Sequence, residues 1–284
     1  MKKLALNQAN MRMEEEAVQS WLEKNGYKRP LLVQYSEWLG NAVTGDFGES
    51  YVFKNRDVSE LLIPKLIVSA KLNIISFIIA ISIGTPLGFY AAVNYGSSKD
   101  PIVVIISLVF YAMPVFFTAP LLILVFALQL DLVPAAGWGG VFDKRIILPA
   151  LTIGVPGAAV FVRLIRSSML EVLDSEFVKL ARAIGVGWNK VIYKHALKNA
   201  LITPLTSALL LFSGWLNGAL VIEIIFGWPG IGYDALFTAV NDNDFPLLQG
   251  TVFFFVIIFV IFALLADLLY TIIDPRVRLT GGEK

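Results

Sequence analysis

Five long apolar stretches constrain this chain more than any other feature of its sequence. They cover about residues 66–93, 101–128, 146–164, 203–226 and 247–273. A helix needs roughly 20 mostly apolar residues to cross the hydrocarbon layer of a membrane, and each stretch meets that length. We therefore expect an all-α integral membrane protein with about five transmembrane helices. In the second stretch, Pro114 and Pro120 each remove a helix hydrogen-bond donor, which predicts a kink or a short interfacial helix before the span proper.

Composition excludes several classes of protein. The chain is 57% hydrophobic and only 16% charged, so a soluble domain of its 284 residues would lack the charge to cover its surface. A net charge of +1 gives no reason to expect nucleic acid as a partner. There is no cysteine, and His195 is the only histidine. We therefore expect no metal site, no cofactor and no enzymatic activity, and the chain has no phosphate-binding G-x-x-x-x-G-K-[ST] loop for ATP.

The charges between the stretches predict the orientation. Residues 166–200 carry more basic than acidic side chains, whereas residues 227–246 carry aspartates and no Lys or Arg. Basic loops remain in the cytoplasm. The loop 166–202 and the tail 276–284 are therefore predicted to be cytoplasmic, within and after a transmembrane domain covering 66–275.

The same alternation places residues 1–65 outside the cell, although no signal sequence or earlier span precedes them. Each charge buried during translocation costs about 2.5–3.5 kcal/mol. Either a helix that should precede this segment is missing or the segment behaves unusually, and we favour the missing helix. Within the segment, Pro30 is expected to break a helical run over 11–39, and 41–55 is turn-rich.

The cytoplasmic loop has the pattern of two short helices. Phe177, Leu180, Ala181 and Ile184 share one helical face. Two glycines, at 185 and 187, then end that helix in the region where positive φ costs least. A second amphipathic helix is predicted from the apolar residues Val191, Ile192, Ala196 and Leu197. The loop is thus expected to project from the membrane with a fixed geometry.

Several motifs resemble one protein family. They are Ala181-Arg182-Ala183-Ile184-Gly185, His195-Ala196-Leu197-Lys198-Asn199-Ala200 with Pro204, Gly45-Asp46-Phe47-Gly48-Glu49-Ser50, Ile222 to Gly232, and Asp267 to Arg276. They resemble motifs of permease subunits of ATP-binding-cassette importers, in the dipeptide/oligopeptide/nickel branch. The resemblance covers about residues 12–278, with the motifs in the same order and without large gaps. Lys179 stands where the general loop motif has a glutamate. Family members usually begin with one more helix, which this chain lacks.

The resemblance implies partners and roles. A solute-binding protein would deliver peptide at the outer face of the cytoplasmic membrane, and a second homologous permease subunit and two ATP-binding subunits would complete the importer. The loop would dock on an ATPase through the following residues: Glu176, Lys179, Ala181, Arg182, Ala183, Gly185 and His195. The charged members also fit a solvated face with i,i+3 pairing, Gly185 fits a structural turn, and His195 fits a packing or capping role.

Two residues near the outer end of the fourth stretch are candidates for the translocation path or its gate. Glu223 would be costly if it faced lipid, and its alternative is to reach the outer interface. Trp228 begins a Trp-Pro-Gly turn and fits an interfacial anchor equally well.

For the whole chain, the alternative function is a secondary transporter or channel subunit working alone. That class normally has more intramembrane ionisable groups or an inverted repeat.

Overall fold

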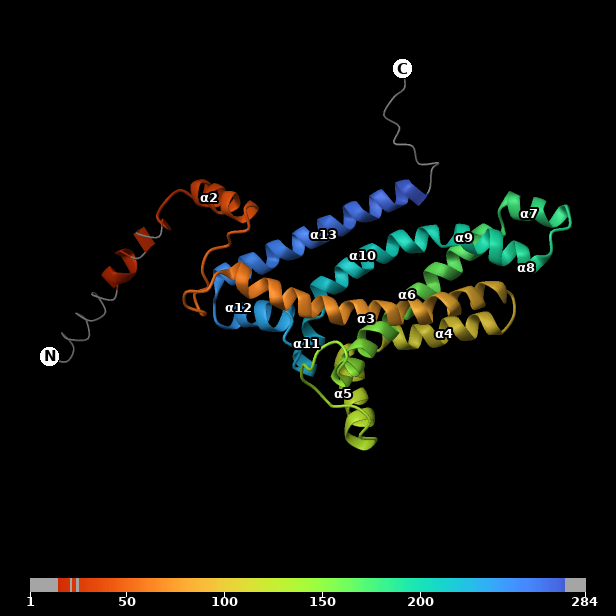
Figure 1. Cartoon of the computed structure of the whole chain (residues 1–284), viewed down its shortest axis with the longest axis horizontal. Coiled ribbons are helices and arrows are strands. Elements are labelled where there is room, and N and C mark those ends of the chain that lie inside the picture. The colour runs from red at the N-terminus through yellow and green to blue at the C-terminus, as the bar shows by residue number, and fades with distance from the viewer. Residues whose placement is uncertain (1–14, 21, 24–25, 274–284) are drawn as a thin grey trace, which may run out of the picture.

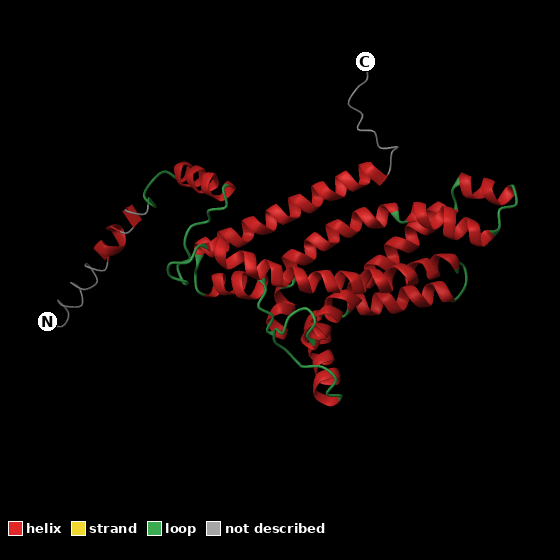
Figure 2. Ribbon diagram, in the orientation of Figure 1, coloured by secondary structure: helices red, strands yellow, loops and turns green. Residues whose placement is uncertain are grey.

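Helices make up most of the computed structural model, which describes residues 15–20, 22–23 and 26–273. Figure 2 shows them joined by loops, and the β-type pairing recorded in the described part is an isolated bridge between Glu49 and Asp57. Four of these helices are long and apolar enough to cross a membrane, or up to six if each of two bent pairs is one span. The predicted all-α membrane fold with about five spans is confirmed.

Two long helices form the centre, α3 (Val58–Val93) and α6 (Ile147–Leu173), and they pack along each other over much of their length (Figure 1). Glycine permits this close approach. A Cβ atom at Gly84 would lie 2.5 Å from the carbonyl oxygen of Ala158, and one at Gly88 would lie 2.7 Å from that of Val162. Larger residues would force the two backbones apart.

The second apolar stretch is bent, as its prolines predict. Helix α4 (Lys99–Ala112) ends at Met113, and the chain resumes at Val115 as α5 (Val115–Leu122) and the π-helix η1 (Ile123–Gln129). The two parts meet at 93°. Pro114 stands at the bend and begins α5 as its N-cap, while Pro120 lies within α5. The predicted kink is confirmed.

The fourth apolar stretch is not one continuous helix. Helix α10 (Ile202–Gly218) is followed after Ala219 by α11 (Leu220–Phe226), where a single span over 203–226 was predicted. Helix α11 forms a bent pair with the segment of η4 (Ile231–Phe237) and α12 (Thr238–Asn241), and the two directions differ by 99°. The left-handed backbone of Gly227, with φ +59°, starts the turn between them.

Helix α13 (Phe245–Ile273) packs mainly against α10 and also touches α3. Its outer side is apolar and exposed in the single chain, with Val252, Val256, Phe259 and Val260 each about half exposed. Such a surface suits lipid or another membrane helix, because water would be a poor solvent for it.

Two of the connecting regions lie at opposite ends of the bundle (Figure 1). At one end, α2 (Leu31–Val43) begins directly after Pro30, which confirms the predicted break. Beyond α2, Phe47 joins a buried cluster with Val58, Leu62 and Leu247. At the opposite end lies the loop that joins α6 to α10.

Candidate functional site

The loop between α6 and α10 begins with α7 (Glu176–Ala183), as predicted. The predicted apolar face lies outward: Phe177, Leu180 and Ile184 are 43%, 63% and 72% exposed. Val178, on another side of the helix, is buried and is the residue that fixes α7 to the rest of the chain. Three large apolar side chains thus form an exposed stripe, which we call the α7 stripe, on a helix that projects from the bundle (Figure 1).

The end of α7 is set by Gly185. Its amide donates to the carbonyl of Arg182 at 3.0 Å, and the amide of Val186 donates to the carbonyl of Ala181 at 3.0 Å. These two bonds define a Schellman motif, in which the C′ residue takes a left-handed backbone. Gly185 has φ +86°, which confirms the predicted turn. Gly187 differs from the prediction, because its φ is −59° and it precedes the short helix α8 (Trp188–Lys190) as N-cap.

The charged residues of α7 pair within the loop. Lys179 contacts Asp174 at 3.2 Å and Glu176 at 3.3 Å, and these bonds raise the pKa of the Lys179 ammonium, chiefly through Asp174. The guanidinium of Arg182 lies 4.9 Å from the ring centre of Trp188, across the turn. All of these side chains remain largely exposed, so they stabilise the loop without occupying the α7 stripe.

The second half of the loop is anchored to the bundle. The predicted second helix is present as the π-helix η3 (Val191–Ala196) followed by α9 (Leu197–Ala200). Ile192 and Ala196 are buried in one cluster with Ile165 and Met169 of α6. His195 is half-buried, and its carbonyl accepts a hydrogen bond from the side chain of Asn199 at 2.8 Å. The second half of the loop is therefore packed against the end of α6.

An ion pair that the sequence reasoning did not find joins α4 to α6 close to this loop. The guanidinium of Arg166 donates two bonds to the carboxylate of Asp100, at 2.6 and 2.8 Å. The Asp100 side chain is 7% exposed and that of Arg166 is 27% exposed. Paired two-point contacts of this kind are among the strongest side-chain hydrogen bonds. Arg166 also lies over the ring of Tyr95, which follows α3.

Glu223 is fully buried inside the α11–η4 hairpin. Its Oε1 accepts a 2.5 Å hydrogen bond from the Ser69 hydroxyl, and its Oε2 accepts one from the amide of Tyr233 at 2.9 Å. Ser69 Oγ in turn accepts from the amide of Ile231 at 2.8 Å. A Cβ atom at Gly230 would lie 2.2 Å from Glu223 Oε1, so only glycine leaves room for this arrangement. The carboxylate thus ties the hairpin to α3.

Trp228 is also buried in the single chain. Its ring meets that of Trp138 edge to face with centroids 4.5 Å apart, and it packs in a cluster with Leu72 and Ile146. Glu223 and Trp228 are therefore brought together as parts of one closed hairpin. Their predicted place in a path or gate depends on whether that hairpin moves, and it stays a prediction.

The partner of Glu223 belongs to a polar pattern that is visible in the sequence. Ser69, Asn73 and Ser76 recur on one face of the otherwise apolar α3, and all three are buried. Polar side chains at helical spacing within a span face protein rather than lipid. The partner of Arg166 had no such signal, because Asp100 lies in the first turn of α4, where an acidic residue is common for its effect on the helix dipole.

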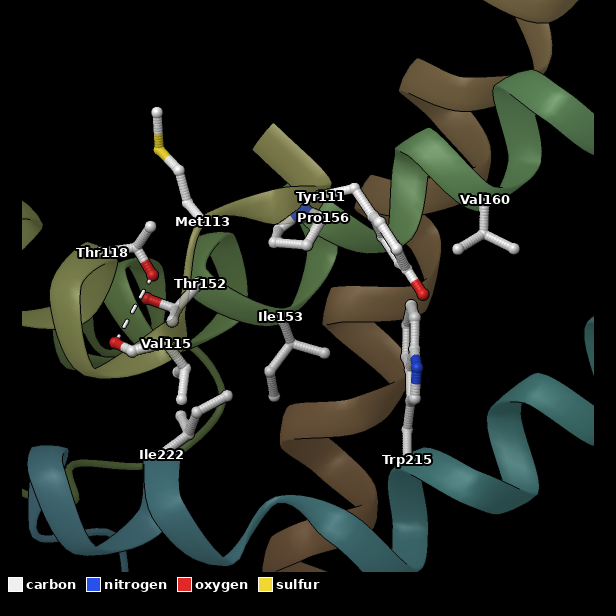
Figure 3. A pocket seen from close by; sticks show the side chains of 11 residues that line it. Tyr111, Met113, Val115, Thr118, Thr152, Ile153, Pro156, Val160, Trp215 and Ile222 are labelled. Carbon is white, nitrogen blue, oxygen red and sulfur yellow. Dashed lines mark hydrogen bonds between the residues drawn. The ribbon is translucent and has the colours of Figure 1, made fainter. Parts of the chain in front are cut away.

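A pocket lies where α4 and α5 bend beside α6 and α10 (Figure 3). Its volume is about 210 Å³. Tyr111 from α4 and Trp215 from α10 point toward each other across it, and Ile153, Pro156 and Val160 of α6 line the wall between them.

Comparison with known proteins identifies the chain's relatives. A family described as the inner membrane component of binding-protein-dependent transport systems matches residues 84–279. The oligopeptide transport system permease protein OppB of Haemophilus influenzae is 37% identical over 249 residues, covering 88% of this chain and 81% of that protein. The dipeptide transport system permease protein DppB of Alkalihalophilus pseudofirmus is 37% identical over 289 residues, covering 93% and 86%.

Solved structures agree on the fold. An inward-facing structure of the MetNI methionine ABC transporter aligns with a TM-score of 0.64, over 75% of this chain and 96% of that chain, at 15% identity. A crystal structure of an amino acid ABC transporter with histidines aligns with a TM-score of 0.54, over 77% and 95%, at 18% identity. At such identities the likeness concerns the arrangement of helices alone.

Proposed function

The chain belongs to the family of binding-protein-dependent transport inner membrane components, and on that basis we propose that it is the membrane-spanning permease subunit of an ATP-binding-cassette importer for peptides. The peptide substrate follows from relatives whose names specify dipeptides and oligopeptides. The complete importer would contain a second homologous permease subunit, two cytoplasmic ATPase subunits and an extracytoplasmic solute-binding protein.

The observation that carries this proposal is the α7 stripe. Phe177, Leu180 and Ile184 expose apolar surface on a helix that projects from the bundle, and the rest of the described chain leaves them uncovered. An exposed apolar patch rimmed by charges marks a site of interaction with another protein or with a membrane. A groove on an ATPase subunit is the partner we assign to it, with Glu176, Lys179 and Arg182 at the rim and Ala181 and Ala183 permitting close approach.

The connections of the loop give the docking a mechanical consequence. Helix α6 leads directly into α7 after a short turn, and η3 and α9 lead into α10. A rigid displacement of α7 by the closing ATPases would therefore tilt α6 and α10. The Asp100–Arg166 pair would carry that tilt to α4 and its bend. ATP binding would in this way bias a two-state membrane element between outward and inward access.

The proposed orientation puts loop 166–202 and tail 276–284 in the cytoplasm and residues 1–65 outside. The α11–η4 hairpin then lies near the outer face, where Glu223 acts as a positioning residue for a gate that includes Trp228.

Single cysteines test the orientation of the chain in the membrane, because the chain has no cysteine of its own. Val43→Cys in α2 and Ile184→Cys in the loop lie at sites that are 74% and 72% exposed. An impermeant thiol reagent should label the first in intact cells and the second only after permeabilisation, and the opposite pattern would reverse the topology.

Co-purification tests the function. The chain should bring down ATPase subunits, and the complex should hydrolyse ATP and take up peptide in vesicles when the binding protein is added. Leu180→Asp places a charge within the α7 stripe and should abolish the association. Asn189→Asp adds the same charge to an exposed site on α8, away from the stripe, and should leave it intact. Peptide uptake by the chain without ATPases would refute the proposal and favour an autonomous transporter.

A further inference from the structure

The pocket at the bend of the second apolar stretch has a wall of uncharged side chains. Besides Tyr111 and Trp215 it is formed by aliphatic residues, Pro156, Met113 and two threonines, Thr118 and Thr152. The threonine hydroxyls already donate within their own helices, Thr152 to the carbonyl of Leu148 at 2.8 Å and Thr118 to nearby carbonyls of α5 at 3.4 Å. The pocket therefore offers apolar and aromatic contact rather than a charge partner.

Its size suits a ring or a branched aliphatic group. An apolar cavity of about 150 Å³ is known to hold a benzene molecule, and this pocket has about 210 Å³. A cation also lies near one wall, because the guanidinium of Arg163 stands 5.1 Å from the centre of the Tyr111 ring. A second positive charge would be repelled from this site, whereas a neutral side chain would not.

The backbone around the pocket argues against lipid as its occupant. The α4–α5 break at Met113 and Pro114 interrupts the helix, and Pro156 supplies no amide hydrogen to the carbonyl of Thr152 in α6. Irregular backbone at membrane depth is tolerated where it is buried in protein or lines a water-filled cavity, and not against lipid. The pocket also lies between α6 and α10, which lead into and out of the projecting loop, so a movement of that loop would reshape it.

We propose that this pocket is a subsite of the translocation pathway that takes an uncharged apolar or aromatic side chain of the passing peptide. The proposal rests on the proposed function and specifies which substrates use this site. Peptides with a phenyl-sized side chain engage it during passage. Peptides with only methyl side chains pass without filling it, and those with a lysine side chain do not enter it.

Cysteine protection tests occupancy directly in the complete importer. Val160→Cys is a small change at a half-buried lining position and introduces the sole thiol of this chain. During ATP-driven turnover, Ala-Phe should slow labelling of Cys by N-ethylmaleimide, whereas Ala-Ala and Ala-Lys should leave the rate unchanged. A thiol that is unreactive before peptide is added would mean that another chain or a lipid covers the pocket, and that result overturns the proposal. Equal labelling with all three peptides overturns it as well.

A filling variant tests the consequence for transport. Val160→Phe should reduce uptake of Ala-Phe relative to Ala-Ala by at least about tenfold, because a single methylene in an apolar pocket already changes discrimination by roughly 10–200-fold. Val155→Phe is the matched control, since Val155 is half-buried on the same helix and does not line the pocket. ATP-dependent uptake of Ala-Ala by the wild-type importer reports on the proposed function, and the ratio of the two uptakes reports on the pocket. An unchanged ratio in Val160→Phe overturns the pocket proposal alone.

Discussion

Gly185 provides a test of the projecting loop in which the expected cost can be worked out from its backbone. Its φ is +86°, and a Cβ atom built there meets no atom within 4 Å. Substitution therefore adds no steric clash with neighbours, and the cost is that of the left-handed backbone, roughly 1–2 kcal/mol for an L-residue. A difference of that size changes a two-state ratio by a factor of about 5–30. Gly185→Ser should therefore leave the Schellman turn formed in a much smaller share of molecules.

The second glycine of the loop supplies a matched control. Gly187 has φ −59°, also meets no atom within 4 Å at its Cβ position, and occupies an N-cap position where serine is favoured. We expect Gly185→Ser to lower peptide uptake per ATP hydrolysed several-fold, Gly185→Val to lower it further, and Gly187→Ser to change it little. Gly185→Asn should be the mildest change at its position, because asparagine tolerates this backbone.

The assay is uptake and ATP hydrolysis measured together in vesicles containing the assembled importer, with membrane insertion checked by the amount of protein recovered. If Gly185→Ser and Gly187→Ser reduce the uptake-to-hydrolysis ratio equally, the turn geometry is not what transmits the ATPase movement. Unchanged coupling in Gly185→Val would refute the reasoning more severely, since a β-branched residue is the least compatible with a positive φ.

Two further predictions concern the buried polar contacts. Asp100→Asn leaves Arg166 facing a neutral amide and should destabilise the chain by about 2 kcal/mol in denaturant unfolding. This is below the roughly 3–5 kcal/mol of a fully buried pair, because Arg166 keeps some solvent contact. The double variant with Arg166→Gln should recover part of the lost stability, and strictly additive effects of the two substitutions would contradict a direct pair. Gly230→Ala must displace Glu223 and should cost at least the roughly 0.5–1.5 kcal/mol of one hydrogen bond. Gly214→Ala, with open space around it in α10, should cost nothing, and equal thermal stability of the two variants would exclude the packing described for the hairpin.

Local features of the chain were predictable where their cause is local. The apolar stretches predicted the membrane helices because length and hydropathy decide whether a helix can cross a bilayer. Pro114 and Pro120 predicted a kink in the second stretch, which the structure shows as a 93° bend, and Gly185 predicted the end of α7. Each of these residues restricts or permits a backbone angle at its own position. The fourth apolar stretch was wrongly predicted to be one continuous span. Its composition continues through Ala219 without a proline, yet the helix breaks there, directly after Gly218.

Contacts across the bundle were decided by tertiary structure alone. Glu223 and Ser69 are 154 residues apart, and Arg166 and Asp100 are 66 apart, so each pairing depends on the register at which two helices pack. The apolar periodicity of α7 predicted a helix, but periodicity cannot say which face is covered, and the structure shows Val178 inward and Leu180 outward. A sequence pattern specifies what each segment can bury, whereas which surfaces meet is a property of the whole packed chain.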